Sequence, residues 1–287
     1  MGQVTLGPDS LRRFGVSLPD GLLSGRTRAD LAIDLAPGAP PRLRLASDLV
    51  GASLSIGAVG WSKPAGTPAD FDLSMELGDT PRVEQLSLSA PGLSAQGRVR
   101  LATGPRFEAL ELSRVRLGGW LDGAVTVTAQ GQGQPPAIRV TGGEIDIRRA
   151  NLGSGGGGGG AARGPVSLRL DRLVVTDTLA LNGFAMDLDP GRALAGGFRG
   201  ALNGGVPVAG TLAGTARGPA IRVQANDAGA VLRDAGLFRD VRGGTMDLIL
   251  RPTGQRGEYD GTLRVRGPQL RNAPALAELL SLSFWSN

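Results

Sequence analysis

The chain has 287 residues, with 31 lysine and arginine residues against 26 aspartate and glutamate residues, which gives a net charge of +5 at pH 7. It contains no histidine and no cysteine, and this excludes Ser-His-Asp and Cys-His catalysis, zinc sites built on those ligands, and disulfide frameworks. Lys63 is the only lysine, so nearly all the positive charge is arginine, whose planar side chain favours phosphate and carboxylate partners.

After a short helix predicted over Asp9–Phe14, stretches of alternating apolar and polar residues dominate the first half of the chain. Alternate side chains of a β-strand share a face, so each stretch predicts a half-buried strand. Gly, Pro and Asp between the stretches predict turns, which favours an all-β, largely antiparallel fold. The alternating apolar residues are Leu31, Ile33, Leu43, Leu45, Leu54, Ile56, Phe71, Leu73, Met75, Leu77, Leu86, Leu88, Val99, Leu101, Leu110, Leu112, Val125, Val127, Ile138, Val140, Ile145 and Ile147.

A glycine run at Gly155–Gly160 interrupts this pattern. It lacks the Lys-Ser/Thr that closes a phosphate-binding loop, so it predicts a flexible connection and no nucleotide site. The string PAIRV occurs on both sides of the run, at residues 136–140 and 219–223, which indicates that one hairpin type is reused. We therefore expect a single β-rich region over residues 1–287, with a soft internal boundary at the loop 153–164.

Beyond the run, strand-like alternation continues to Leu263 and Val265, and helices are predicted at two places. The first lies in the sequence DAGAVLRDAGLF, with Asp227 as its N-cap and Gly236 as its stop, and the second covers Pro274–Leu280. No stretch approaches the roughly 18–20 apolar residues of a membrane helix, and the first residues lack the order of a signal peptide. The sequence as given predicts neither a membrane span nor an export signal.

Two sets of charged residues are candidates for chemistry. Glu144 with Asp146, and Asp187 with Asp189, could form paired acids, but their places near strand ends favour solvated turn residues. Arginine alternates with apolar residues at residues 42–45, 98–101, 114–117 and 264–266, which predicts a polar outer sheet face or contact with anionic groups. With aromatic residues at only 4%, nucleic-acid binding is not expected, and no constellation for an enzyme is present.

The apolar strand faces must be buried against something, and the sequence provides almost no helices to form a second layer. Two interpretations stay open at this point. Either the sheet folds over on itself, or a hydrophobic ligand fills the space.

The segments Asn226–Pro252 and Tyr259–Ser283 resemble the C-terminal region of the AsmA-like family, in particular its YhdP-like branch. The features that carry the resemblance are Asp-Ala-Gly before a short helix, the later Gly-Leu-Phe and Arg-Gly-Gly strings, and an Asn-Ala-Pro-Ala-Leu-Ala helix start; they lie at residues 227–229, 236–238, 242–244 and 272–277. Val50–Leu77 and Gly142–Arg148 are also similar to that branch. The family usually begins with a membrane anchor and continues beyond residue 287, so we expect this chain to be a fragment.

The resemblance implies an elongated, twisted antiparallel sheet that forms an open groove, with a few short helices near the C-terminus. It further implies a periplasmic, inner-membrane-associated protein of the bacterial cell envelope, held by an N-terminal anchor that this chain lacks. In such a protein the groove carries phospholipid acyl chains between the inner and outer membranes without enzymatic activity, cofactor or metal. The rival interpretation is a structural or interaction protein that supports outer-membrane assembly through envelope partners without binding lipid.

On the conduit interpretation, the apolar faces of the predicted strands contact acyl chains. The expected lipid-contacting residues are Leu54, Ile56, Phe71, Leu73, Met75, Leu77, Ile138, Val140, Ile145, Ile147, Leu168, Leu170, Ile221, Val223, Met246, Leu248, Leu250, Leu263 and Val265. Arg139 and Arg169 are expected on the opposite, outer face.

Overall fold

The computed structural model describes residues 2–13, 19, 21–78, 81–102, 106–150, 164–189, 191, 194–255 and 257–270. The chain divides into two compact units, unit 1 (Met1–Pro165) and unit 2 (Val166–Asn287). The division follows directly after the glycine-rich segment 153–164, which lies outside the described residues apart from Gly164.

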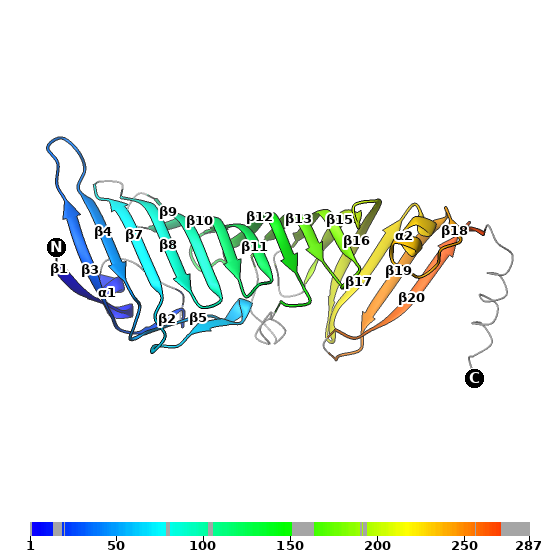
Figure 1. Ribbon diagram of the computed structural model, residues 1–287, viewed down its shortest axis with the longest axis horizontal. Helices are drawn as coiled ribbons and strands as arrows, with labels where there is room; N and C mark the ends of the chain where they lie inside the picture. Colours follow the sequence, from blue (N-terminus) through cyan, green and yellow to red (C-terminus); the bar gives the residue numbers. More distant parts are fainter. Residues whose placement is uncertain are drawn as a thin grey trace. The chain divides into compact units, whose positions relative to one another are not determined.

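The all-β prediction is confirmed, because sixteen strands belong to a large, twisted, mostly antiparallel sheet (Figure 1). In unit 1 each strand of this sheet is antiparallel to its neighbours. The order in unit 1 is β1 (Gly2–Leu6), β3 (Thr27–Asp34), β4 (Arg42–Ser47), β7 (Asp70–Glu76), β8 (Arg82–Ala90), β9 (Leu93–Ala102), β10 (Arg106–Leu117), β11 (Leu121–Thr128) and β12 (Ala137–Asp146).

Unit 2 repeats the same plan, again with antiparallel neighbours. The order of its strands is β13 (Val166–Val174), β14 (Ala180–Leu188), β15 (Ala195–Leu202), β16 (Val206–Thr215), β17 (Gly218–Ala225), β19 (Thr245–Pro252) and β20 (Tyr259–Arg266). A separate two-stranded ladder joins β18 (Val241–Arg242) to β21 (Gln269–Leu270).

The predicted alternation in β7 is confirmed by the register of the sheet. Phe71 lies opposite Leu88 and Leu73 opposite Leu86, whereas Asp72, between them, lies opposite Ser87. Side chains directly opposite each other on neighbouring strands share a face. Strand β7 therefore has one apolar face and one polar face.

A β-bulge in β12 keeps two apolar pairs on one face. Val140 lies opposite Val125 and Ile145 opposite Leu121, although Ile145 is five positions after Val140, an odd offset that would place the two on opposite faces of a regular strand. The extra residue is accommodated at two glycines, residues 142 and 143, both with a φ of 67°, which is left-handed backbone that glycine adopts without strain.

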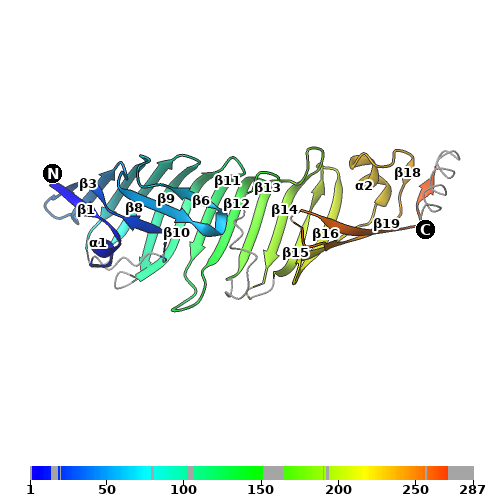
Figure 2. The ribbon, with the colours of Figure 1, turned by 90° about the horizontal axis from the view of Figure 1, so that it is seen from below.

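A small second sheet accompanies the large sheet in unit 1. It consists of β2 (Leu23–Gly25), β5 (Ala52–Ile56) and β6 (Trp61–Lys63), and it follows α1 (Pro8–Arg13) and contains the 3₁₀ turn Gly57–Val59. Both views place this sheet along one end of the large-sheet strands (Figures 1 and 2). Trp61 joins the two sheets, because its Nε1 donates a hydrogen bond of 3.0 Å to the carbonyl of Pro91 in the β8–β9 turn.

Lys63 is buried at only 2% exposure and has a structural role. Its Nζ donates to the backbone carbonyls of Leu49, Ala52 and Pro64, at 2.9, 2.7 and 3.1 Å. Burial lowers the pKa of the Lys63 amine, and Asp48 opposes this effect. The only lysine of the chain therefore fixes the loops around β5 and β6. The exposed basic side chains are arginines.

The helix predicted after Asp227 is confirmed as α2 (Ala228–Asp234). The Asp227 side chain accepts a hydrogen bond of 2.9 Å from the Ala230 amide, and Gly236 has the left-handed φ of 72° expected of a stop. Asn203 donates to the Asp234 carbonyl at 3.2 Å, so the helix ends against the β15–β16 turn. The helix predicted near the N-terminus is also present as α1, whereas the one predicted over Pro274–Leu280 lies outside the described residues.

Candidate functional site

Apolar side chains line up in continuous rows across the strands of unit 1. The first row follows direct cross-strand partners from β3 to β12: Ile33, Leu43, Met75, Val83, Val99, Leu110, Val127 and Ile138. A second row on the same face contains Leu31, Leu45, Leu73, Leu86, Gly97, Leu112, Val125 and Val140. We call the surface formed by these two rows the apolar face of unit 1.

The exposure of this face changes from one end of the strands to the other. At the end near the β8–β9 and β10–β11 turns, Leu93, Leu117 and Leu121 are only 6%, 4% and 8% exposed. At the opposite end, Ile33 is 52% and Phe107 is 44% exposed. Most members of the two rows are half-buried. Because a sheet face covered by a second layer would be fully buried, the described residues leave the middle and the open end of this face accessible.

Unit 2 has an apolar face of the same construction. One row consists of Leu168, Met186, Phe198, Gly210, Val223, Leu248 and Leu263, and a second consists of Val166, Leu188, Gly196, Leu212, Ile221, Leu250 and Gly261. The rings of Phe184 and Phe198 lie 6.1 Å apart. Each unit therefore has a ladder of apolar side chains that runs perpendicular to its strands.

Most of the predicted lipid-contacting residues lie on these faces. Phe71, Leu73, Met75, Ile138, Val140 and Ile145 belong to unit 1, and Leu168, Leu170, Ile221, Val223, Met246, Leu248, Leu250, Leu263 and Val265 belong to unit 2. Leu77 follows the end of β7 and is half-buried. Ile147 follows the end of β12 and is 45% exposed. Ile145 is buried at the covered end of β12, at 8% exposure, and Leu170 is buried in the middle of β13, at 3% exposure.

Leu54 and Ile56 were expected on the same surface but belong to the small sheet. They lie opposite Lys63 and Trp61 on β6, so they share the face from which Trp61 reaches the β8–β9 turn. Alternation assigns a residue to one face of its own strand and carries no information about which sheet the strand joins. The structure thus separates these two residues from the rows described above.

The register also adds residues to the site. Leu43, Val99, Leu110 and Val127 were read as strand residues only, whereas Val83 of unit 1 and Met186, Phe198 and Leu212 of unit 2 were not singled out in the sequence. The same alternation marks the first four residues in the sequence. Only the pairing of the strands shows that they continue the rows of the predicted residues.

The opposite face of unit 1 is polar, and several of its arginines are paired across strands. Arg44 lies 2.6 Å from Asp34, and Arg98 lies 2.7 Å from Glu111. Arg114 and Arg116 both contact Asp122, at 3.2 and 3.1 Å, and hydrogen bonds from these arginines lower the pKa of that carboxyl group. The predicted charged outer face is therefore present, with its arginine repeats in unit 1 largely neutralised by acids on neighbouring strands.

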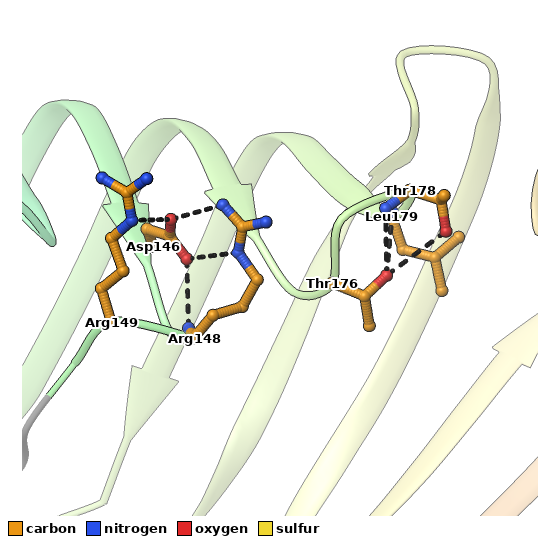
Figure 3. Close-up of polar contacts among 6 residues, drawn as sticks. All are labelled: Asp146, Arg148, Arg149, Thr176, Thr178 and Leu179. Atoms are coloured by element: carbon orange, nitrogen blue, oxygen red, sulfur yellow. Dashed lines mark hydrogen bonds and ion pairs between the residues drawn. The ribbon is translucent and has the colours of Figure 1, made fainter.

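Asp146 is not the solvated turn acid that the sequence suggested. It is 5% exposed at the end of β12, and Arg148 Nε and the Arg148 amide donate to its Oδ1 at 2.8 and 3.1 Å (Figure 3). Arg149 adds an ion pair of 3.5 Å. The hydrogen bonds from Arg148 lower the pKa of Asp146 to about 2. Sequence position alone could not show this burial, because it depends on the fold around the end of β12, where the Asp146 amide donates to the Trp120 carbonyl at 2.8 Å.

We expect Asp146 to make the stability of the protein sensitive to acid. Its folded-state pKa is depressed, so its contribution is complete above the ordinary pKa near 4 and is lost as the pH falls towards about 2. Asp146→Asn should lower the melting temperature at pH 7 and weaken the fall in stability between pH 4 and pH 2. Urea unfolding at several pH values tests this, and an unchanged acid dependence in the variant would contradict it.

Asp187, another of the acidic candidates, has a simple structural partner. One terminal nitrogen of Arg169 on β13 donates to both carboxylate oxygens of Asp187 on β14, at 2.9 and 2.8 Å. These hydrogen bonds lower the pKa of Asp187. The neighbouring β13–β14 turn is closed by Thr176, whose Oγ1 accepts from the amides of Thr178 and Leu179 (Figure 3). In the described part of the chain, no group of three or more acidic residues is placed to hold a metal ion.

None of the helices within the described ranges is long and apolar enough to cross a membrane. Comparisons with protein-family models, with curated proteins and with solved structures find no match for this chain. The apolar faces of units 1 and 2 are therefore the features that support a function.

Proposed function

We propose that this chain is a non-enzymatic segment of a lipid-transfer conduit, in which phospholipid acyl chains lie on the apolar faces of the sheet. The observation that carries the proposal is the half-buried state of the apolar rows, with Ile33 and Phe107 exposed at the open end of unit 1. A long row of apolar side chains exposed to water is unfavourable unless a partner covers it. A partner that is narrow, flexible and apolar fits a face that extends across many strands.

The construction of the rows suits movement of such a partner. Neighbouring strands are about 4.8 Å apart, so an acyl chain that moves along a row meets a similar apolar side chain at each strand. Each buried CH₂ group contributes roughly 0.8 kcal/mol of transfer free energy. Because the row members from Ile33 to Ile138 are all aliphatic, one contact replaces another during movement and little net free energy separates successive positions.

The open end of unit 1 gives a lipid headgroup a place to stay in water. Exposure rises from 4% at Leu117 to 44% at Phe107, the two ends of the apolar face of β10. An acyl chain on the face can therefore leave its polar headgroup at the wet end, where no desolvation of the headgroup is needed. With the resemblance to the AsmA-like family, we place this conduit in the bacterial envelope, between inner and outer membranes.

Photocrosslinking from two adjacent residues of β8 tests the proposal. Leu86 lies on the apolar face and Ser87 on the polar face, and both are half-buried. A photoreactive residue at position 86 should crosslink to phospholipid in expressing bacteria, and mass spectrometry of the purified chain should detect the same lipid. The residue at position 87 should give little adduct.

Equal adducts from both positions, or a purified chain free of lipid, would contradict the conduit. The second outcome would favour the rival function, in which the apolar face binds an envelope protein and the chain supports outer-membrane assembly without carrying lipid. Protein adducts at position 86 in the same experiment would identify that rival directly.

A further inference from the structure

The polar face of unit 2 differs from that of unit 1 in its balance of charge. Arg222 donates from Nε and from one terminal nitrogen to the two carboxylate oxygens of Asp247 on β19, at 2.7 and 2.8 Å. Arg264 lies directly opposite Asp247 on β20, and Arg266 lies opposite Thr245. The charges of Arg222, Arg264 and Arg266 all lower the pKa of this one carboxyl group. Three guanidinium groups thus face one carboxylate, which leaves two positive charges in excess.

This excess is larger than at the two arginine repeats of β9 and β10. The repeat at residues 98–100 is matched by Glu111 and Glu108, at 2.7 and 3.0 Å, and Arg114 and Arg116 share Asp122. Among the described residues that line this part of the face, Asp247 is the only acid beside Arg264 and Arg266, and Arg222 already binds both of its carboxylate oxygens. The structure therefore places two guanidinium groups where they could bind an anion from solution.

The surface beside these arginines is hollowed. A depression of about 310 Å³ is lined by Arg222, Asp247, Arg264 and Arg266, and it adjoins a second of about 760 Å³. The two depressions share Gln224 and Asn226. The larger depression forms where the side chains of β15 and β16 are small, with Ala201 opposite Pro207. The amide side chains of Gln224 and Asn226 thus line the space beside the arginines.

This site lies on the face opposite the apolar rows. Gln224, Asp247 and Arg264 are direct cross-strand partners, and each is adjacent in sequence to a member of the row that contains Val223, Leu248 and Leu263. Neighbouring residues of a strand point to opposite faces. Ligands of the two faces are therefore separated by the sheet, and binding at this site does not depend on the proposed lipid function.

We propose that these two depressions bind a phosphate group carried by a polar ligand, with Arg264 and Arg266 contacting the phosphate and Gln224 and Asn226 contacting the polar body. A phosphate monoester carries about two negative charges at neutral pH, which matches the excess on the protein. Guanidinium groups bind phosphate oxygens through parallel, charge-assisted hydrogen bonds. The phosphate could belong to a soluble molecule or to the headgroup of a phospholipid.

Two binding measurements on the full chain distinguish these sources. Calorimetric titration with inorganic phosphate tests a soluble ligand, and co-sedimentation with phosphatidylcholine vesicles with or without phosphatidic acid tests a headgroup. Binding in either assay should weaken about tenfold or more in the double variant Arg264→Gln/Arg266→Gln. Asp247→Asn should instead strengthen binding, because it removes the repelling carboxylate and releases the Arg222 side chain.

The matched control is Arg98→Gln/Arg100→Gln, which removes the same charge from a repeat that already has acidic partners. The melting temperature of each variant shows whether it is folded. If the double variant is not folded, Asp247→Asn still tests the site. Absence of binding in both assays would overturn the proposal. Equal weakening in both double variants would also overturn it, because net charge alone would then explain the binding.

Discussion

Val127→Asp is expected to abolish lipid binding while the protein remains folded. Val127 lies in the first apolar row, between Leu110 and Ile138, and it is half-buried. A carboxylate at this position can stay hydrated in the lipid-free protein but would face acyl chains in the loaded one. Burying a charge against hydrocarbon costs several kcal/mol, so bound phospholipid should fall by at least about a hundredfold. Quantitative mass spectrometry of the purified chain measures this loss.

The neighbouring residue provides the matched control. Thr126 is half-buried on the polar face, between Glu111 and Arg139, so Thr126→Asp introduces the same charge on the same strand. It should leave lipid content unchanged, since Arg139 lies opposite it and the polar face contacts no acyl chain. Normal lipid content in folded Val127→Asp, or equal loss in both variants, would argue against lipid on the apolar face.

Gly97→Ala is expected to destabilise unit 1 strongly. Gly97 lies in the second apolar row, where β9 and β10 change register, and a Cβ added there would lie 2.0 Å from the Glu111 carbonyl oxygen. Gly97 and the Glu111 carbonyl both belong to paired strands, so the strands must separate to accommodate the methyl group. We expect the free energy of unfolding to fall by about 3 kcal/mol, measured by urea unfolding.

Gly66→Ala is the control for this prediction. Gly66 lies in the turn before β7, has no heavy atom within 4 Å of an added Cβ, and does not have left-handed backbone. Its substitution should change the free energy of unfolding by no more than about 0.5 kcal/mol. A comparable effect of both substitutions would show that the close approach of β9 and β10 is not what Gly97 provides.

Two kinds of result could be predicted from the sequence, because their causes are local. The alternation from Phe71 to Met75 fixes which side chains share a face, since the period of a strand is two residues. Asp227 and Gly236 mark the ends of α2, since an N-cap and a left-handed stop act within one helical turn. The arginine repeats indicated a charged face in the same way, before any strand had been paired.

The tertiary structure alone decided how these local pieces combine. The two-glycine bulge that places Val140 and Ile145 on one face depends on the partner strand β11, and the burial of Lys63 depends on carbonyl groups from three separate residues. Leu54 and Ile56 belong to the small sheet because β5 pairs with β2 and β6, and Asp146 is buried although it lies at the end of its strand. The charge excess around Arg264 likewise arises from pairing of β17, β19 and β20, since alternation gives each strand its faces but no information about its neighbours.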